Sequence, residues 1–142
     1  MPDDREEEII IRSNNIDERI LKLIYSIKSG RDKLTCYEEG SIRLIEPKSV
    51  FYFEAVDNKV FVYCESKVFE IRQKLYEIEQ QFENSDFIRV SKSVIVNLGK
   101  IQKLTPTFNS RFEALLKNGE KIIISRQYVP EMKKKLGIGG QP

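Results

Sequence analysis

Short apolar segments separated by turn residues fill positions 33–125 of this 142-residue chain, and they limit its fold more than any other feature. Many of these segments carry an apolar side chain at every second position, which predicts strands. Glu39-Gly40, Asp57-Asn58 and Asn118-Gly119 supply turns between them, and Asn-Gly is the preferred pair for a two-residue type I′ hairpin. We therefore predict a mainly β domain of the α+β class with peripheral helices.

The bounds of the expected elements follow from the spacing of the apolar residues. Where apolar residues lie three and four apart, helices are expected over about residues 16–29, 72–82 and 130–136. The run Val94-Ile95-Val96 is expected to form a helical turn capped by Ser91 or Ser93. Strands are expected over residues 6–12, 34–37, 42–45, 50–55, 60–64, 68–70, 87–90, 101–107, 112–117 and 120–125.

Charge is distributed unevenly along the chain, although the net charge is only +2. Residues 89–136 hold 11 Lys+Arg against 3 Asp+Glu, a net charge of +8, whereas residues 1–88 carry a net charge of −6. A basic C-terminal third on an acidic body indicates a positive face directed toward a polyanion.

The residue types that most enzymes need are missing or uninformative. The chain has no histidine, which removes the commonest general base and metal ligand. No glycine-rich phosphate loop and no G-x-S-x-G elbow occurs. The two cysteines, Cys36 and Cys64, are expected to be reduced and buried. We therefore expect a protein that is not an enzyme, with no cofactor, no metal and no small-molecule substrate.

Two blocks in the basic third interleave cations and serines with apolar residues. The first is Phe-Ile-Arg-Val-Ser-Lys-Ser-Val-Ile-Val-Asn over residues 87–97, and the second is Ile-Ser-Arg-Gln-Tyr over residues 124–128. Cations supply charge and hydroxyls supply hydrogen bonds, so these blocks suit a phosphate backbone. Arg126 stands just past a strand of three isoleucines, where a rigid scaffold would present it.

The two blocks, with the Asn118-Gly119 hairpin between them, resemble the LytTR family of bacterial DNA-binding domains. The family pattern is approximately F-x-R-[VI]-[HS]-[RKN]-S-x-[IV]-V-N, then an N-G-type hairpin, then S-R-x-Y. The resemblance covers about residues 40–136. It implies short antiparallel sheets stacked on one another, with loops rather than a recognition helix entering successive major grooves of duplex DNA.

Carried over by position, the resemblance implies a set of DNA-contacting residues on three loops. Asn97 is expected to hold a turn by a structural hydrogen bond instead of touching DNA. Ser91-Lys92 replaces the His-Arg or His-Asn that the family often has, so the base preference there can differ. The implied contacts are Lys59 on the first loop, Arg89, Ser91 and Lys92 on the second, Ser125 and Arg126 on the third, and Lys100 and Gln127 as weaker phosphate contacts.

The same reasoning gives an expected organisation and setting. Residues 1–35 are expected to form a strand–helix extension, residues 36–137 the DNA-binding domain, and residues 138–142 a flexible tail. Residues 1–35 are too short for a receiver domain, so the chain resembles the free-standing members, some of which have a membrane partner protein. No apolar run approaches the ~20 residues of a membrane helix, and a cytoplasmic location is expected.

The leading hypothesis is a sequence-specific transcriptional regulator that binds paired sites on double-stranded DNA as a homodimer. An RNA-binding module is a second hypothesis, because exposed aromatic rings stack on splayed bases. A protein-interaction module is a third, in which the acidic half and the helix at about residues 16–29 would dock a partner.

Overall fold

The computed structural model describes residues 19–20 and 33–138, and the chain divides into two compact units, Met1–Lys33 and Leu34–Pro142. In the first unit Arg19, Ile20 and Lys33 are described, and the first two are helical. The expected strand over residues 6–12 and the rest of the helix over residues 16–29 lie outside the described residues, as does the expected tail beyond Ile138.

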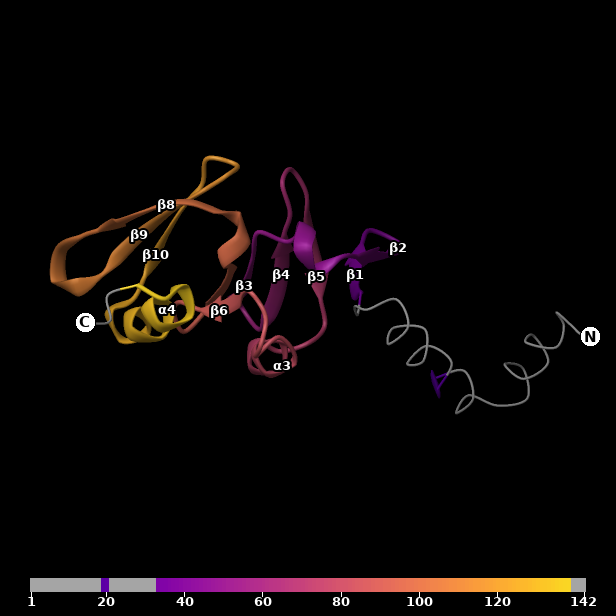
Figure 1. Cartoon of the computed structure of the whole chain (residues 1–142). Coiled ribbons are helices and arrows are strands. Elements are labelled where there is room, and N and C mark those ends of the chain that lie inside the picture. Colours follow the sequence, from indigo (N-terminus) through magenta and orange to yellow (C-terminus); the bar gives the residue numbers. More distant parts are fainter. Residues whose placement is uncertain (1–18, 21–32, 139–142) are drawn as a thin grey trace, which may run out of the picture. The chain divides into compact units, whose positions relative to one another are not determined.

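Ten short strands and two short α-helices make up the described part of the second unit, which confirms the predicted fold class of antiparallel sheets with peripheral helices. In residues 33–138 no helix is long and apolar enough to cross a membrane. The helices, shown in Figure 1, are α3 (Leu75–Gln81) and α4 (Val129–Leu136). The strands are β1 (Leu34–Glu38), β2 (Ser41–Ile45), β3 (Tyr52–Val56), β4 (Lys59–Tyr63), β5 (Val68–Ile71), β6 (Phe87–Arg89), β7 (Val94–Asn97), β8 (Ile101–Pro106), β9 (Phe112–Leu116) and β10 (Lys121–Ile124).

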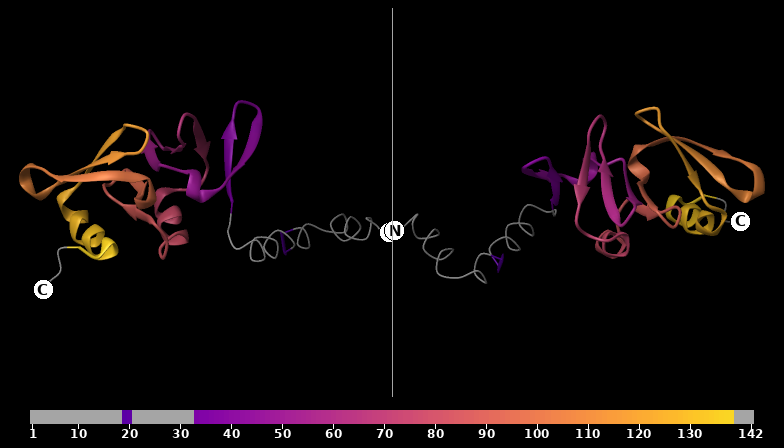
Figure 2. Two further views of the ribbon diagram at one scale, coloured as in Figure 1. Left: turned by 45° about the horizontal axis from the view of Figure 1, so that its top comes forward. Right: turned by 180° about the vertical axis from the view of Figure 1, so that it is seen from behind.

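These strands form two antiparallel sheets. A seven-stranded sheet has the order β2-β1-β5-β4-β3-β7-β6, and a three-stranded sheet has the order β10-β9-β8. Helix α3 lies along one side of the larger sheet, whereas α4 lies beside the smaller one, and the two views of Figure 2 agree on this arrangement. Short 3₁₀ turns connect several strands, among them Pro47–Ser49 before β3 and Leu98–Lys100 after β7.

Two hydrophobic clusters lie on opposite faces of the β3–β7 pair. Phe53 and Ile95 point into the first cluster, with Leu75 and Ile78 of α3. The neighbours on the same strands, including Val96, point into the second cluster, with the inner face of the three-stranded sheet and Met132 of α4. Because both faces of β3 and β7 are covered, their loops are held by a rigid layer.

The expected helical turn over residues 94–96 is wrong, because these residues form strand β7. Glu54, Phe53 and Tyr52 of β3 pair with Val94, Ile95 and Val96 in register. A strand buried on both faces is apolar at every position, so it lacks the alternation that marks a half-buried strand. β-branched residues also favour a strand over a helix.

The turn chemistry of one hairpin differs from the expectation, whereas the turn expected at Asp57-Asn58 is confirmed. The Asn118-Gly119 hairpin is not a two-residue type I′ turn, because Gly119 alone has a positive φ, of +94°, and Leu116 faces Glu120 across a three-residue loop. This is the common three-residue connection with glycine in the left-handed position. Asp57 and Asn58, by contrast, both have positive φ values, 50° and 66°, and link Val56 to Lys59 as a two-residue type I′ turn does.

Helix α4 is bounded by the residues that the sequence indicated. Pro130 sits in the first turn, where its missing N–H costs nothing. Gly137 ends the helix with a φ of +73°, and the amide groups of Gly137 and Ile138 donate to the carbonyls of Lys134 and Lys133, a Schellman arrangement. The helix anchors the segment between β10 and its own first turn, where the second sequence block lies.

Candidate functional site

Three of the loops singled out by the sequence meet at one end of the β3–β7 pair. The amide of Ala55, just before the β3–β4 turn, donates to the carbonyl of Ser93 at 2.8 Å. The amide of Ser125, just after β10, donates to the carbonyl of Val90 at 2.9 Å. These backbone bonds join the β3–β4 turn, the β6–β7 loop and the β10–α4 connection into one surface, which we call the loop end (residues 56–59, 90–94 and 125–127).

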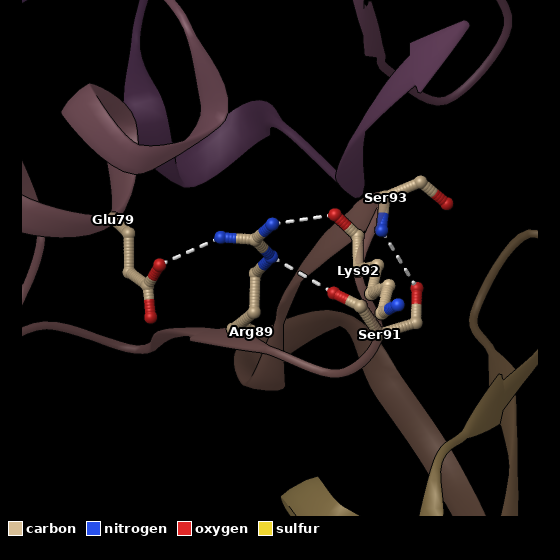
Figure 3. A network of polar contacts seen from close by, with 5 residues as sticks. All are labelled: Glu79, Arg89, Ser91, Lys92 and Ser93. Atoms are coloured by element: carbon tan, nitrogen blue, oxygen red, sulfur yellow. Dashed lines mark hydrogen bonds and ion pairs between the residues drawn. The ribbon is translucent and has the colours of Figure 1, made fainter.

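Arg89 organises the β6–β7 loop from within, as Figure 3 shows. Its Nε donates to the Ser91 carbonyl at 2.8 Å, Nη2 donates to the Lys92 carbonyl, and Nη1 pairs with Glu79 of α3 at 2.7 Å. The side chain is only 18% exposed. Charge-assisted bonds of this kind are stronger than neutral ones, so the guanidinium fixes the loop backbone.

The loop that Arg89 holds presents the next residues outward. The Ser91 hydroxyl accepts a bond from the Ser93 amide at 3.2 Å, which closes a tight turn. Lys92 is exposed, and its ammonium lies away from the Arg89 guanidinium in Figure 3. The backbone carbonyl of Lys92 therefore accepts a hydrogen bond within the protein, whereas its side-chain ammonium faces solvent.

The β10–α4 connection repeats this pattern. Ile124 is fully buried, the half-buried Ser125 accepts a bond at its carbonyl from the Tyr128 amide at 2.9 Å, and Arg126 is exposed. Gln127 is exposed beside it. In both loops a buried apolar residue is followed by a half-buried serine and an exposed cation. The serine is therefore bonded to the protein, whereas the charged side chain faces solvent.

The exposed cations of the loop end have unpaired side chains. Within residues 33–138, the side chains of Lys59, Lys92 and Arg126 make no hydrogen bond or ion pair with a described residue. Elsewhere Arg43 pairs with Glu38 at 2.8 Å, and Lys121 pairs with Glu113 at 3.5 Å. An unpaired cation keeps its full charge for an anionic ligand.

Lys100 does not join this surface. It follows β7 at the opposite end of the β3–β7 pair, where its ammonium lies 5.0 Å from the centre of the Phe51 ring. The half-buried side chain covers that ring through a cation–π contact. We call this region the fastened end (residues 49–52, 63–64 and 97–100).

Asn97 fastens that end, which confirms the structural role predicted for it. Its side chain is 4% exposed. Nδ2 donates to the Val50 carbonyl at 2.8 Å, and Oδ1 accepts from the Gly99 amide at 2.9 Å. Both polar atoms of a buried amide are thus satisfied within the protein.

Two tyrosines and two cysteines complete the fastened end and its surroundings. The Tyr52 and Tyr63 rings stack with centroids 4.3 Å apart. Burial, followed by a hydrogen bond to the Glu120 carboxylate, raises the pKa of Tyr52, and burial and Glu54 raise the pKa of Tyr63. Cys36 is buried and Cys64 half-buried, and neither is in a disulfide, so the expectation of reduced thiols holds while full burial holds for Cys36 alone.

The structure also brings forward a loop that sequence reasoning missed. The β8–β9 loop carries Asn109 and Arg111 next to Ser125, Arg126 and Gln127, and these five residues line a hollow of about 510 Å³. The signal in the sequence is weak, because Arg111 lies outside both blocks and 14 positions before Ser125. Only the folding of the small sheet places the two loops together.

Comparison with known proteins matches this chain to one family of DNA-binding domains. The family model described as the LytTr DNA-binding domain matches residues 40–137. The solved structure of a LytTr DNA-binding domain from Bacillus cereus superposes with a TM-score of 0.72 at 29% identity, covering 76% of this chain and 99% of that one.

Relatives of known sequence agree with this match. The sensory transduction protein LytT of Bacillus subtilis is 30% identical over 136 residues, which are 96% of this chain and 56% of that protein. LytT of Enterococcus faecalis is 33% identical over 100 residues, covering 70% of this chain and 41% of that protein. The chain therefore spans about half the length of these relatives. An uncharacterised HTH-type transcriptional regulator of Staphylococcus aureus is 29% identical over 94% of this chain and 91% of its own length.

Proposed function

Because the chain belongs to the LytTR family of DNA-binding domains, we propose that it is a sequence-specific transcriptional regulator that binds double-stranded DNA through the loops of its loop end. The observation that carries the proposal is the set of unpaired cations, one on each of the three loops. Lys59, Lys92 and Arg126 come from segments far apart in sequence, yet the backbone bonds of Ala55 and Ser125 join their loops.

Loops suit the reading of grooves here better than a helix does. In residues 33–138 the helices α3 and α4 are separated by strands β6 to β10, so they form no helix-turn-helix pair. A rigid sheet layer behind short loops can hold side chains in register with successive major grooves. Backbone pairing near each cation favours this: Ser91 and Ser125 accept or donate next to Lys92 and Arg126, and Lys59 faces Val56 across the two-residue turn.

The proposed roles follow from chemistry and exposure. Arg126 is the proposed base-reading residue, because an exposed guanidinium can bind guanine O6 and N7 together. Lys59 and Lys92 are proposed to contact phosphates, with hydrogen bonds from Ser91, Ser125 and Gln127. Arg89 is proposed as a positioning residue, because three of its donors are already used within the protein.

Other features of the proposal concern the assembly. We propose a homodimer on paired sites, since two copies on one face of the duplex would double the small number of base contacts that each domain makes. The candidate source of the signal is a membrane partner protein. The proposed function is binding without catalysis, and its setting is the cytoplasm, where the target DNA lies.

The test is quantitative binding to a duplex from upstream of the chain's own coding sequence, at several salt concentrations. Arg126→Ala should cost on the order of 1–3 kcal/mol and relax the preference for the specific duplex, whereas Lys92→Ala should weaken specific and non-specific duplexes alike. The matched control is Lys48→Ala, which removes an exposed cation next to the fastened end and should leave binding unchanged. Tighter binding to single-stranded RNA than to duplex DNA would contradict the proposal.

A further inference from the structure

We propose that the β8–β9 loop adds a fourth contact to the surface, a site for one phosphodiester group held jointly by Arg111 and Arg126. This inference rests on the proposed function, because it takes the ligand to be a backbone phosphate of the bound duplex. It concerns a loop that carries neither of the sequence blocks.

The first support is the hollow between two loops. Asn109 and Arg111 line it from one side, and Ser125, Arg126 and Gln127 line it from the other. All five residues carry polar side chains with hydrogen-bond donors, and no carboxylate lines the hollow. Its volume of about 510 Å³ leaves ample room for a phosphate group with its first waters.

The second support is electrostatic. Arg111 and Arg126 are both exposed, and within residues 33–138 the side chain of neither makes a hydrogen bond or ion pair. Two guanidinium groups that border one hollow repel each other unless an anion lies between them. A phosphodiester carries one negative charge and offers oxygens that guanidinium groups bind in pairs, so it matches the unpaired guanidinium groups of Arg111 and Arg126.

The third support is the way the β8–β9 loop presents Arg111. The Thr107 amide donates to the Arg111 carbonyl at 2.8 Å, which closes the loop at its base. Asn109 and Ser110 both adopt left-handed backbone conformations, with φ of 58° and 60°. A non-glycine residue in this region is uncommon, and two in succession give a sharply bent tip. Figures 1 and 2 place this loop and the start of α4 at the same end of the small sheet.

A neighbouring groove indicates on which side of Gln127 the duplex backbone would lie. Gln127 also borders a second groove of about 520 Å³, whose charged lining is three carboxylates (Glu79, Glu83 and Glu131) and two cations (Arg89 and Lys135). Its net negative charge opposes a phosphate, whereas the lining of the first hollow is cationic, so the duplex backbone is favoured on the Arg111 side of Gln127. Backbone bonds join the first three loops, and the hollow joins the third to the fourth, so the cations on neighbouring loops follow the order Lys59, Lys92, Arg126 and Arg111.

The experiment measures duplex affinity against salt concentration for the full chain and for Arg111→Ala, Arg111→Lys and Lys48→Ala. Arg111→Ala should weaken specific and non-specific duplexes by the same factor, on the order of tenfold at low salt, and should lower the slope of log affinity against log salt by about 1. Arg111→Lys keeps the charge and should keep the slope. Thermal unfolding of each variant should match that of the parent, since the side chain is exposed.

Several results would overturn the inference without touching the proposed function. If Arg111→Ala behaves like Lys48→Ala while Arg126→Ala loses affinity, the fourth contact does not exist. If Arg111→Ala weakens only the specific duplex, the residue reads a base instead of a phosphate. If the parent chain binds no duplex at all, the proposed function fails, and this inference fails with it.

Free phosphate is the alternative source of the same ligand chemistry, and a second arm separates it. Inorganic phosphate is added to the parent chain and to Arg111→Ala without DNA, against chloride at equal ionic strength. We expect no difference in thermal stability between the two salts for either protein. Stabilisation of the parent chain alone by phosphate would mean that the hollow binds the free ion and would overturn the assignment to the duplex.

Discussion

The two ends of the β3–β7 pair carry similar residues and use them in opposite ways. At the loop end, the side chains of Lys59, Lys92 and Arg126 have no partner among the described residues. At the fastened end, Lys100 covers the Phe51 ring, and the amide of Asn97 is bonded at both polar atoms. The same layer of strands thus has one end whose polar groups are left for a ligand and another whose polar groups hold the fold.

The residues that we expect to govern DNA affinity and the residues that govern folding stability therefore lie at opposite ends of the same strands. Polar groups at the fastened end are buried, so their removal leaves unsatisfied partners and costs stability. Cations at the loop end are exposed, so their removal costs little in the free protein and much in a complex. Arg89 stands between the two cases, because it lies at the loop end but is mostly buried and bonded.

The largest effect on stability is expected for Asn97→Ala at the fastened end. It strands the Val50 carbonyl and the Gly99 amide, which should lower the free energy of unfolding by about 2–3 kcal/mol. Urea denaturation measures this. The control is Asn118→Ala, which removes one exposed bond to the Glu120 amide and should cost about 0.5–1 kcal/mol. Equal losses in the two variants would contradict the contrast between the ends.

The next largest effect is expected for Arg89, which we expect to contribute both to folding stability and to duplex binding. Arg89→Ala should lower stability by about 1–2 kcal/mol and also weaken duplex binding, because the carbonyls of Ser91 and Lys92 lose their donor. Arg89→Lys should restore neither property, since a single ammonium cannot reach both carbonyls and Glu79 in that fork geometry. Denaturation and duplex titration measure the two properties. Full rescue by lysine would indicate a simple charge contact with DNA.

A smaller effect is expected from the tyrosine pair at high pH. The pKa of Tyr52 is raised by burial and by its bond to Glu120, so the folded chain keeps its proton above the unfolded pKa of about 10. Stability is then fully present below pH 10 and falls as the pH rises above it. Denaturation from pH 8 to pH 11.5 should show this fall, and Tyr52→Phe should flatten it. A parent curve that stays level above pH 10 would contradict the assignment.

The smallest expected effect distinguishes the two thiols. Burial raises the pKa of Cys36 to about 12, so little thiolate forms at pH 8. Burial also raises the pKa of Cys64, but Ser49 and Lys100 at the fastened end counteract it. Iodoacetamide at pH 8 should therefore label Cys64 first, as peptide mapping would detect. Preferential labelling of Cys36 would contradict this order and would show that strand β1 opens in solution.

The sequence predicted the structure best where a single local requirement decides which residue type a position needs. Gly137 ends α4 because a left-handed residue is needed there, and the hairpin strands alternate because one face is buried. The Val94-Ile95-Val96 run was misread because burial on both faces removes the alternation. The Asn118-Gly119 turn was misread because the pairing of Leu116 with Glu120, and not the favoured dipeptide, sets the loop length.

The sequence by itself determined the class of fold, the family resemblance and the basic character of residues 89–136, because these depend on residue types and their order. The tertiary structure decided which cations lie on neighbouring loops. It turned Arg89 inward onto two carbonyls, placed Lys100 at the far end of β7, and brought Arg111 beside Arg126. The physical reason is that contact between loops depends on strand direction and sheet stacking, which pair residues at long separations in sequence that no local pattern records.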